Sequence, residues 1–243
     1  PRLHTSPTNG GFLSLSFLVG SFVVWRKAKE EAFDEEKIFD AIVVVVLFAL
    51  LGSRLHFIFL NFEHFGFNLL KWFWLTKYAG LCLHGGLLAG TLSLYFFTKK
   101  EKWNFWQTAD IAVFGLSLGQ AIAKVGCFFN ERDLTQISEA IWAFLVFYLL
   151  LKLERRYRLF NWYKGKKDRA EPGFLALFYL ISYFFARIFL EKLRGDSLCL
   201  SGLVVLAAFF GLYLRSGREL KEDYQLIFGR LKYKLKGVGR KEK

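Results

Sequence analysis

IFDAIVVVVLFALLGSRLHFIFL, residues 38–60, decides the fold class, because it is an almost uninterrupted apolar run with Arg54 embedded in it. A helix needs about 20 predominantly apolar residues to cross the hydrocarbon core of a bilayer. Six more apolar blocks lie along the chain, at 11–25, 81–97, 105–128, 138–151, 173–190 and 199–214. They are too long and too uniformly apolar for the strands of a barrel, and only helices or closed barrels satisfy their backbone hydrogen bonds in lipid. The sequence therefore predicts an all-α integral membrane protein, a seven-helix transmembrane bundle.

The composition supports this class. The chain has 243 residues, of which 54% are hydrophobic and 19% aromatic, and its mean hydropathy is +0.28. Charged residues are concentrated between the apolar blocks, as is typical of an integral membrane protein. We expect one membrane domain, residues 1–214, followed by a basic cytoplasmic tail, residues 215–243.

The distribution of Lys and Arg predicts the orientation. Basic residues are clustered in 26–37, 98–104, 152–172 and the tail from Arg215, and these segments alternate with poorly charged connections. The positive-inside rule then places the N-terminus outside and the C-terminus inside. The net charge of +13 is attributed to cytoplasmic loops that face anionic lipid. Nucleic acid is not a predicted partner.

A few polar residues interrupt the apolar blocks. An ionisable side chain inside a membrane is costly, so each one is a candidate for a functional site. With the predicted orientation they fall near the outer ends of their helices, and they are Arg54, His84, Lys124, Asn130, Arg187, Glu191 and Arg194. We expect them to form one basic pocket within or beside the outer leaflet.

Such a pocket favours a limited chemistry. Clustered cations suit a phosphate or a carboxylate, and arginine binds phosphate oxygens in a bidentate manner. At lipid depth, this indicates a phospholipid headgroup. His84 adds proton transfer near neutral pH, and Gly85 and Gly86 allow a backbone to approach a ligand closely. No pair of Cys or His residues has metal-ligand spacing and no nucleotide-binding motif is present, so neither a metal nor a cofactor is predicted.

Other interpretations of these residues stay open. His84 alone is compatible with a hydrogen-bonded packing residue, and Arg187 with Glu191 is compatible with a structural ion pair. The glycine pairs 86/90 and 115/119 favour close helix packing over ligand contact. The aromatic run at 71–78 favours an interfacial belt. Clustered cations also occur in anion channels and transporters, but those would place polar residues at several depths.

Five segments together resemble one enzyme family. HGGLLAG at 84–90 resembles the signature of the bacterial prolipoprotein diacylglyceryl transferases. The order, spacing and predicted topology of the other four segments are also similar to that family. These are GSRLHFIFLNFEHF at 52–65, FWQTADIAVFGLSLGQAIAKVGCFFN at 105–130, LTQISE at 134–139 and FARIFLEKLRGD at 185–196.

The resemblance implies a specific reaction in the bacterial cytoplasmic (inner) membrane. The family transfers diacylglyceryl from phosphatidylglycerol to the thiol of the lipobox cysteine in a prolipoprotein signal peptide, and glycerol phosphate leaves. On this interpretation His84 and Arg187 are catalytic, His84 as base or orienting group, while Arg187 and Lys124 hold the phosphate. Substrate-binding roles are implied for Arg54, Asn130, Glu191, Arg194, Gly85 and Gly86.

The chain departs from the family at four places. Lys124 stands where the family has Arg, and Glu131 and Arg132 follow Asn130 where the family continues Gly-Glu. Phe12 or Leu13 occupies the place of a tyrosine in the first helix, and residues 131–137 replace a sizeable outer insertion. The second interpretation is therefore a non-catalytic phospholipid-binding relative.

Overall fold

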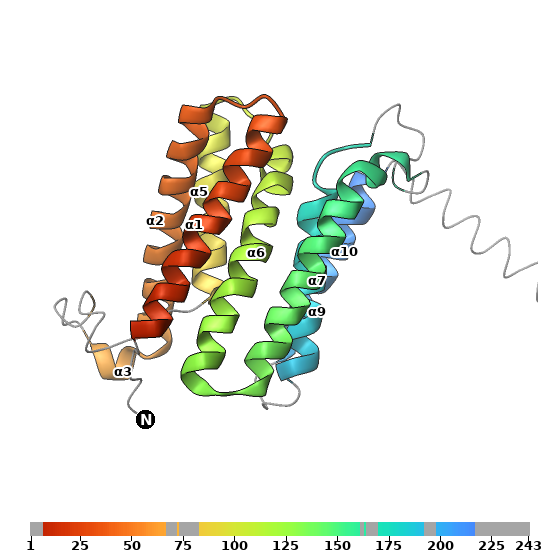
Figure 1. Cartoon of the computed structure of the whole chain (residues 1–243). Coiled ribbons are helices and arrows are strands. Elements are labelled where there is room, and N and C mark those ends of the chain that lie inside the picture. Colours follow the sequence, from red (N-terminus) through yellow and green to blue (C-terminus); the bar gives the residue numbers. More distant parts are fainter. Residues whose placement is uncertain are drawn as a thin grey trace, which may run out of the picture. The chain divides into compact units, whose positions relative to one another are not determined.

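The structure is a computed structural model that describes residues 7–66, 72, 83–160, 163, 170–191 and 198–216. Within these residues all regular structure is helical, and the described residues of the predicted apolar blocks, apart from Gly173, lie in helices (Figure 1). The seven long helices are α1 (Pro7–Glu30), α2 (Glu35–Leu60), α5 (Leu83–Lys100), α6 (Phe105–Glu131), α7 (Leu134–Arg156), α9 (Phe174–Glu191) and α10 (Leu198–Arg215). Two short elements are α3 (Phe62–Phe65) and the 3₁₀ turn η1 (Tyr157–Leu159). The predicted all-α class is confirmed.

Four segments of the described residues are long and apolar enough to cross a membrane: Gly10–Glu30, Glu35–Leu60, Phe105–Phe129 and Leu134–Leu159. Phe174–Phe189 and Gly202–Arg215 are shorter apolar helices. The 26 residues of α2 extend over about 39 Å at about 1.5 Å per residue, which exceeds a hydrocarbon core of about 30 Å. Length and apolarity thus support a multi-pass membrane protein, whereas the seven predicted crossings stay a prediction.

The chain divides after Tyr148 into two compact units, unit 1 (Pro1–Tyr148) and unit 2 (Leu149–Lys243). In unit 1 the main pairs are α1 with α6 and α2 with α5. Figure 1 shows that α2 ends, α5 begins and α6 ends at the same end of unit 1. The predicted site residues of unit 1 belong to these three helix ends, so the fold gathers them at one level.

Glycines set how closely these helices approach. A methyl group added to Gly119 would lie 3.2 Å from the carbonyl oxygen of Ser16 on α1, and one added to Gly90 would lie 3.3 Å from Cβ of Ala49 on α2. Gly115 and Gly86 make similar approaches to the same two helices. Small residues spaced four apart allow backbones of membrane helices to pack together. The predicted packing role of both glycine pairs is confirmed.

Polar residues define the helix ends. The Asp34 carboxylate accepts hydrogen bonds from the amides of Glu36 and Lys37 and so caps α2, and Asn104 caps α6 through the amide of Trp106. At the other ends, Ala32, Lys102 and Arg132 adopt positive φ angles of 52–59° just after α1, α5 and α6. This left-handed conformation stops a helix in a single residue.

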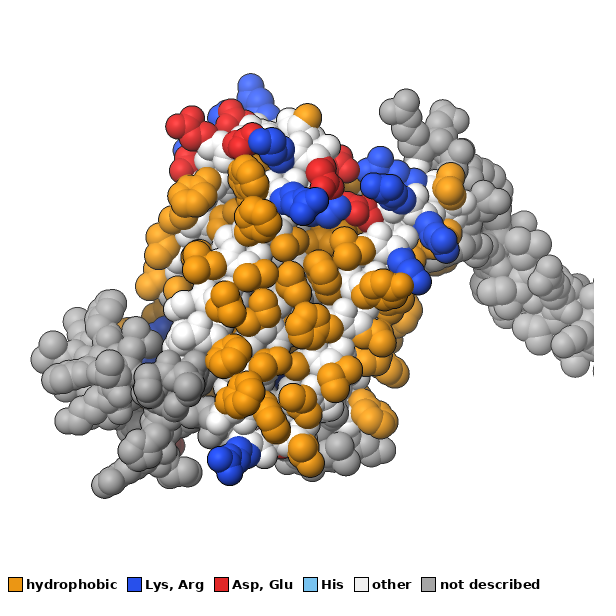
Figure 2. All heavy atoms as spheres, viewed as in Figure 1, with side chains coloured by type: hydrophobic (Ala, Val, Ile, Leu, Met, Phe, Trp, Pro, Cys, Tyr) orange, Lys and Arg blue, Asp and Glu red, His pale blue; other side chains and the backbone are white. Residues whose placement is uncertain are grey.

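The end of unit 1 that carries residues 31–34 and 101–104 is charged. Lys37 pairs with Glu101 at 2.7 Å and Lys29 with Glu35 at 2.7 Å, while Phe33 packs edge-on against Trp103 beneath them. Figure 2 shows Lys, Arg, Asp and Glu gathered at this end and apolar side chains along the helices. The two basic segments 26–37 and 98–104 therefore lie on one side, which the predicted topology requires.

Unit 2 is built around the antiparallel pair α9 and α10. Gly211 of α10 faces Leu177 of α9, and Arg215 at the end of α10 pairs with Glu171 at 3.2 Å and donates to the carbonyl of Pro172. This ties the end of α10 to the start of α9. Arg187, near the end of α9, therefore lies at the opposite end of the pair from Arg215.

Candidate functional site

The predicted site residues of unit 1 gather around two structures at one end, the α2–α5 crossing and the α6–α7 hairpin. His84, Gly85 and Gly86 lie in the first turn of α5, Arg54 lies in the last two turns of α2, and Lys124 lies on α6. Arg187 belongs to unit 2, so it is described separately.

Gly52 and Gly85 mark the closest approach of α2 and α5. A Cβ on Gly52 would lie 2.7 Å from the carbonyl oxygen of Gly85, and a Cβ on Gly85 would collide with the carbonyl of Gly52 and with Cβ of His56. Real Cβ atoms do not tolerate such contacts, so only glycine fits here. Because His84 directly precedes Gly85, this crossing fixes the backbone from which the imidazole projects.

Gly85 and Gly86 thus have a packing function of their own. Gly86 faces the carbonyl oxygen of Ala49 and Cβ of Ser53, at 3.2 and 3.3 Å from the place of an added Cβ. Both contacts are to protein, in agreement with the packing role predicted for the pair 86/90, whereas the predicted close approach to a ligand stays a prediction. Packing alone explains why these positions are glycine.

Arg54 is buried, with 8% of its surface exposed. Its Nε donates to the carbonyl oxygen of Trp72 at 2.9 Å, and its guanidinium lies 5.2 Å from the ring centroid of Phe65 and 5.9 Å from that of Phe57. Cation–π contacts of this kind stabilise a desolvated guanidinium. Arg54 therefore anchors the chain that follows α2, through the backbone of Trp72.

The α6–α7 hairpin has a connection of only two residues, Arg132 and Asp133. Arg132 is left-handed (φ 52°, ψ 30°) and its amide donates to the carbonyl of Phe128 at 2.8 Å. The Asp133 carboxylate accepts from the backbone amide of Thr135 at 2.9 Å, which caps the first turn of α7. The two helices consequently run back along each other from a tightly defined turn.

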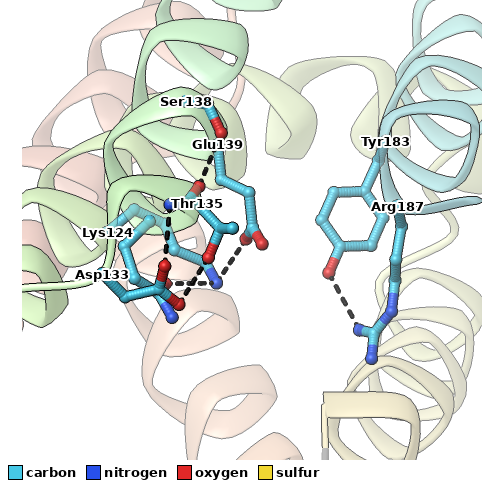
Figure 3. A network of polar contacts seen from close by, with 8 residues as sticks. Lys124, Asp133, Thr135, Ser138, Glu139, Tyr183 and Arg187 are labelled. Carbon is cyan, nitrogen blue, oxygen red and sulfur yellow. Dashed lines mark hydrogen bonds and ion pairs between the residues drawn. The ribbon is translucent and has the colours of Figure 1, made fainter. Parts of the chain in front are cut away.

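Lys124 is held in this hairpin between two residues of α7 (Figure 3). Its Nζ pairs with Oε2 of Glu139 and donates to Oε1 of Gln136 at 3.1 Å. The side chains of Lys124 and Glu139 are 31% and 28% exposed, and Gln136 is buried. The ammonium of Lys124 thus already has a counter-ion. The predicted pocket contained one carboxylate, Glu191, but no ion pair of Lys124.

Arg187 in unit 2 has an aromatic neighbour on its own helix. Nη1 of Arg187 donates to the hydroxyl oxygen of Tyr183 at 3.4 Å (Figure 3). Tyr183 in turn stacks on Tyr179 at 6.2 Å between ring centroids and meets Phe184 edge-on at 5.1 Å. The Tyr183 ring is fixed by these contacts and therefore offers Arg187 a defined acceptor.

Some predicted site residues lie outside the described part of the molecule. Arg194 falls there entirely, as does the aromatic run 71–78 apart from Trp72, and the tail beyond Ser216. For Asn130 and Glu191 only the helical backbone is described. The roles of Asn130, Glu191 and Arg194 therefore stay predictions.

Tyr183 and His56 also belong to these sites and were not singled out from the sequence, and the pairing of Glu139 with Lys124 was not predicted either. Tyr183 precedes Arg187 by four residues, a spacing that places both on one helix face, so this signal was available. Glu139 and Lys124 have no such spacing, and their pairing depends on the tight turn. His56 is revealed only by its contact with the Gly85 position.

Phe12 occupies a defined place on α1. Its ring stacks on Phe129 of α6 at 5.6 Å, and its Cβ and Cγ fill the space in front of Gly126. Phe12, one of the two residues considered for the place of the family tyrosine, thus contacts α6 at Gly126, two residues along that helix from Lys124.

Comparisons with known proteins identify one family. The profile described as prolipoprotein diacylglyceryl transferase matches residues 8–134 and 131–214. The chain is 27% identical to a phosphatidylglycerol–prolipoprotein diacylglyceryl transferase of Prochlorococcus marinus (strain MIT 9301), over 85% of this chain and 84% of the relative. Proteins of the same name from Synechococcus sp. (strain CC9902) and Parasynechococcus marenigrum (strain WH8102) are 25% and 29% identical, over 86% and 80% of this chain and 89% and 78% of the relatives.

The matched residues extend from α1 to α10 and include the helices that are long and apolar enough to cross a membrane. The chain belongs to the prolipoprotein diacylglyceryl transferase family.

Proposed function

We propose that this protein transfers the diacylglyceryl group of phosphatidylglycerol to the lipobox cysteine thiol of a prolipoprotein. The observation that carries the proposal is the family match from residue 8 to residue 214. In the reaction the cysteine sulfur forms a bond to the glyceryl carbon, the bond from that carbon to the phosphate oxygen breaks, and glycerol phosphate leaves. The proton of the thiol passes to a base.

The described residues fit these steps. His84, whose backbone is fixed by the Gly52–Gly85 contact, is the proposed base or orienting group for the thiol, because the thiolate is the nucleophile. Lys124 and Arg187 are proposed to bind the phosphate, where positive charge stabilises the leaving group. Arg54 is proposed to shape the headgroup site by anchoring the chain at Trp72.

The remaining roles follow from the sequence. Glu191 is proposed to position Arg187 or Arg194, and Asn130 to line the headgroup site. Gly85 and Gly86 are proposed to border it.

The proposed orientation puts the active end of unit 1 toward the outer leaflet of the bacterial cytoplasmic membrane. Segments 26–37 and 98–104 then face the cytoplasm, and the N-terminus lies outside and the C-terminus inside. A prolipoprotein arriving through the membrane would present its cysteine near the outer surface, at the level of His84 and Lys124.

The test is transfer in proteoliposomes that contain phosphatidylglycerol and a lipobox peptide. We expect a thioether product with the unchanged protein, and a loss of about 100-fold or more with His84→Ala, the size typical of removing a general acid–base group. Arg187→Ala is expected to lose transfer to a similar degree. Leu88→Ala serves as the matched control, because Leu88 lies one turn from His84 on α5 and is 65% exposed.

The same preparation separates the alternatives. Binding of phosphatidylglycerol without thioether formation would replace the proposal with a lipid-binding relative. Neither transfer nor binding would refute it, and anion flux would then be measured.

A further inference from the structure

The ion pair of Lys124 has a consequence for the phosphate site. Lys124 is a proposed phosphate ligand, yet its Nζ is paired with Glu139 and bonded to Gln136. The net charge of this group is therefore zero. An ammonium has three N–H donors, and the two bonds to α7 account for two of them.

The hairpin keeps the carboxylate close to the ammonium. Lys124 and Glu139 stand on the two sides of a connection of two residues. The amide of Arg132 donates to the carbonyl of Phe128, and the carboxylate of Asp133 accepts from the amide of Thr135. The side chains of Lys124 and Glu139 are 31% and 28% exposed, so the pair is not fully buried. Glu139 and a phosphate ligand consequently compete for the ammonium of Lys124.

In the proposed reaction, this competition would affect the release of product. Its substrate is a phosphodiester with one negative charge, whereas its product, glycerol phosphate, is a monoester with up to two. A site built only of cations would bind the product more tightly than the substrate, and release would then limit turnover. A carboxylate next to the cation repels the doubly charged product more strongly than the singly charged substrate.

We propose that Glu139 is an internal counter-ion that exchanges with phosphate on Lys124 and promotes release of the glycerol phosphate product. This rests on the proposed function. Phosphate binding moves Lys124 from Glu139 to the ligand, and departure of the ligand restores the Lys124–Glu139 pair. Gln136 keeps its bond to Lys124 throughout and holds the ammonium in place. Glu139 is thus a positioning residue that acts through Lys124.

The test is Glu139→Gln, which removes the negative charge and retains the size and an acceptor oxygen. We expect the inhibition constant of glycerol phosphate to fall about tenfold, the order of size expected for removing a unit charge several ångströms from the phosphate at an intermediate dielectric. KM for phosphatidylglycerol should fall by less, because the lipid phosphate carries one charge. The value of kcat should fall together with KM.

Two variants accompany this measurement. Glu101→Gln makes the same charge change in the Lys37–Glu101 pair at the opposite end of unit 1, and we expect no change in product inhibition. Glu139→Asp keeps the carboxylate and moves it back by about one bond length, about 1.5 Å, so its inhibition constant should lie between those of the unchanged protein and Glu139→Gln. This series still tests the proposal if Glu139→Gln does not fold.

A second experiment measures direct binding of glycerol phosphate to the detergent-solubilised full chain without peptide. It tests the exchange on Lys124 independently of turnover. Tighter binding by Glu139→Gln supports the proposal. Unchanged or weaker binding would overturn it, since Glu139 would then only orient Lys124. A protein that transfers no lipid but binds glycerol phosphate more tightly as Glu139→Gln would instead refute the proposed function and leave the exchange standing.

Discussion

The two ends of unit 1 use the same pair of residue types in different surroundings. At the charged end, Lys29 and Glu35 are 57% and 50% exposed and lie on either side of the connection between α1 and α2. At the other end, Lys124 and Glu139 lie between helices that are themselves apolar enough to span a membrane. Exposed pairs contribute about 0–1 kcal/mol, whereas a charge left alone among apolar helices is costly. The surroundings of a Lys–Glu ion pair, rather than its residue types, therefore distinguish an exposed surface pair from one in a candidate functional site.

The largest effect of a single substitution on stability is expected at the α2–α5 crossing, which lies at the same end of unit 1 as Lys124. Gly85→Ala places a Cβ against the carbonyl of Gly52 and Cβ of His56, and such overpacking costs about 1–3 kcal/mol or more. We expect a clear fall in the midpoint of thermal unfolding in detergent, together with loss of transfer. Gly202→Ala is the control, because a Cβ there meets nothing within 4 Å. Equal stability of the two variants would contradict the close crossing.

Breaking the ion pair should show the next largest effect. Lys124→Met leaves the Glu139 carboxylate without its cation, which in a fully buried pair costs about 3–5 kcal/mol. Because the two side chains are 31% and 28% exposed, we expect about 1–3 kcal/mol in a denaturant titration. Adding Glu139→Gln should restore most of this stability but no transfer. Lys29→Ala at the exposed end should change stability by less than about 0.5 kcal/mol, and an effect as large as that of Lys124→Met would remove the contrast between the ends.

Tyr183→Phe in unit 2 should show the smallest effect. It removes one acceptor of Arg187, but the bond is long at 3.4 Å and the ring contacts with Tyr179 and Phe184 remain. We expect a stability change of at most about 1 kcal/mol and a loss of transfer of a few fold. A loss as large as that of Arg187→Ala would mean that the hydroxyl itself takes part in the reaction.

The helices were predictable from the sequence because apolarity marks the lipid-facing middle of each one. Each predicted block corresponds to a helix in the described residues, but most helices extend beyond their blocks. The largest extensions are at α1 (Pro7–Glu30), predicted as 11–25, and α7 (Leu134–Arg156), predicted as 138–151. The added turns are polar and end at features such as the left-handed Ala32. Apolar periodicity carries no signal for these turns, since caps and left-handed residues set them.

The site was predictable in part. Ionisable residues in apolar blocks identified Arg54, His84, Lys124 and Arg187 as unusual, because a membrane interior tolerates few of them. Their partners were less accessible to sequence reasoning. The carbonyl of Trp72 that accepts from Arg54 is a backbone group, which no side-chain pattern reveals, and Glu139 becomes the partner of Lys124 only through the turn at Arg132 and Asp133.

That turn also bears on how the protein is made. Lys124 and Glu139 are fifteen residues apart along the chain, and two residues join their helices. Contacts so close in sequence form early, so α6 and α7 can enter the membrane as one hairpin whose opposite charges already neutralise each other. The bilayer then never has to accept the ammonium of Lys124 by itself during biosynthesis.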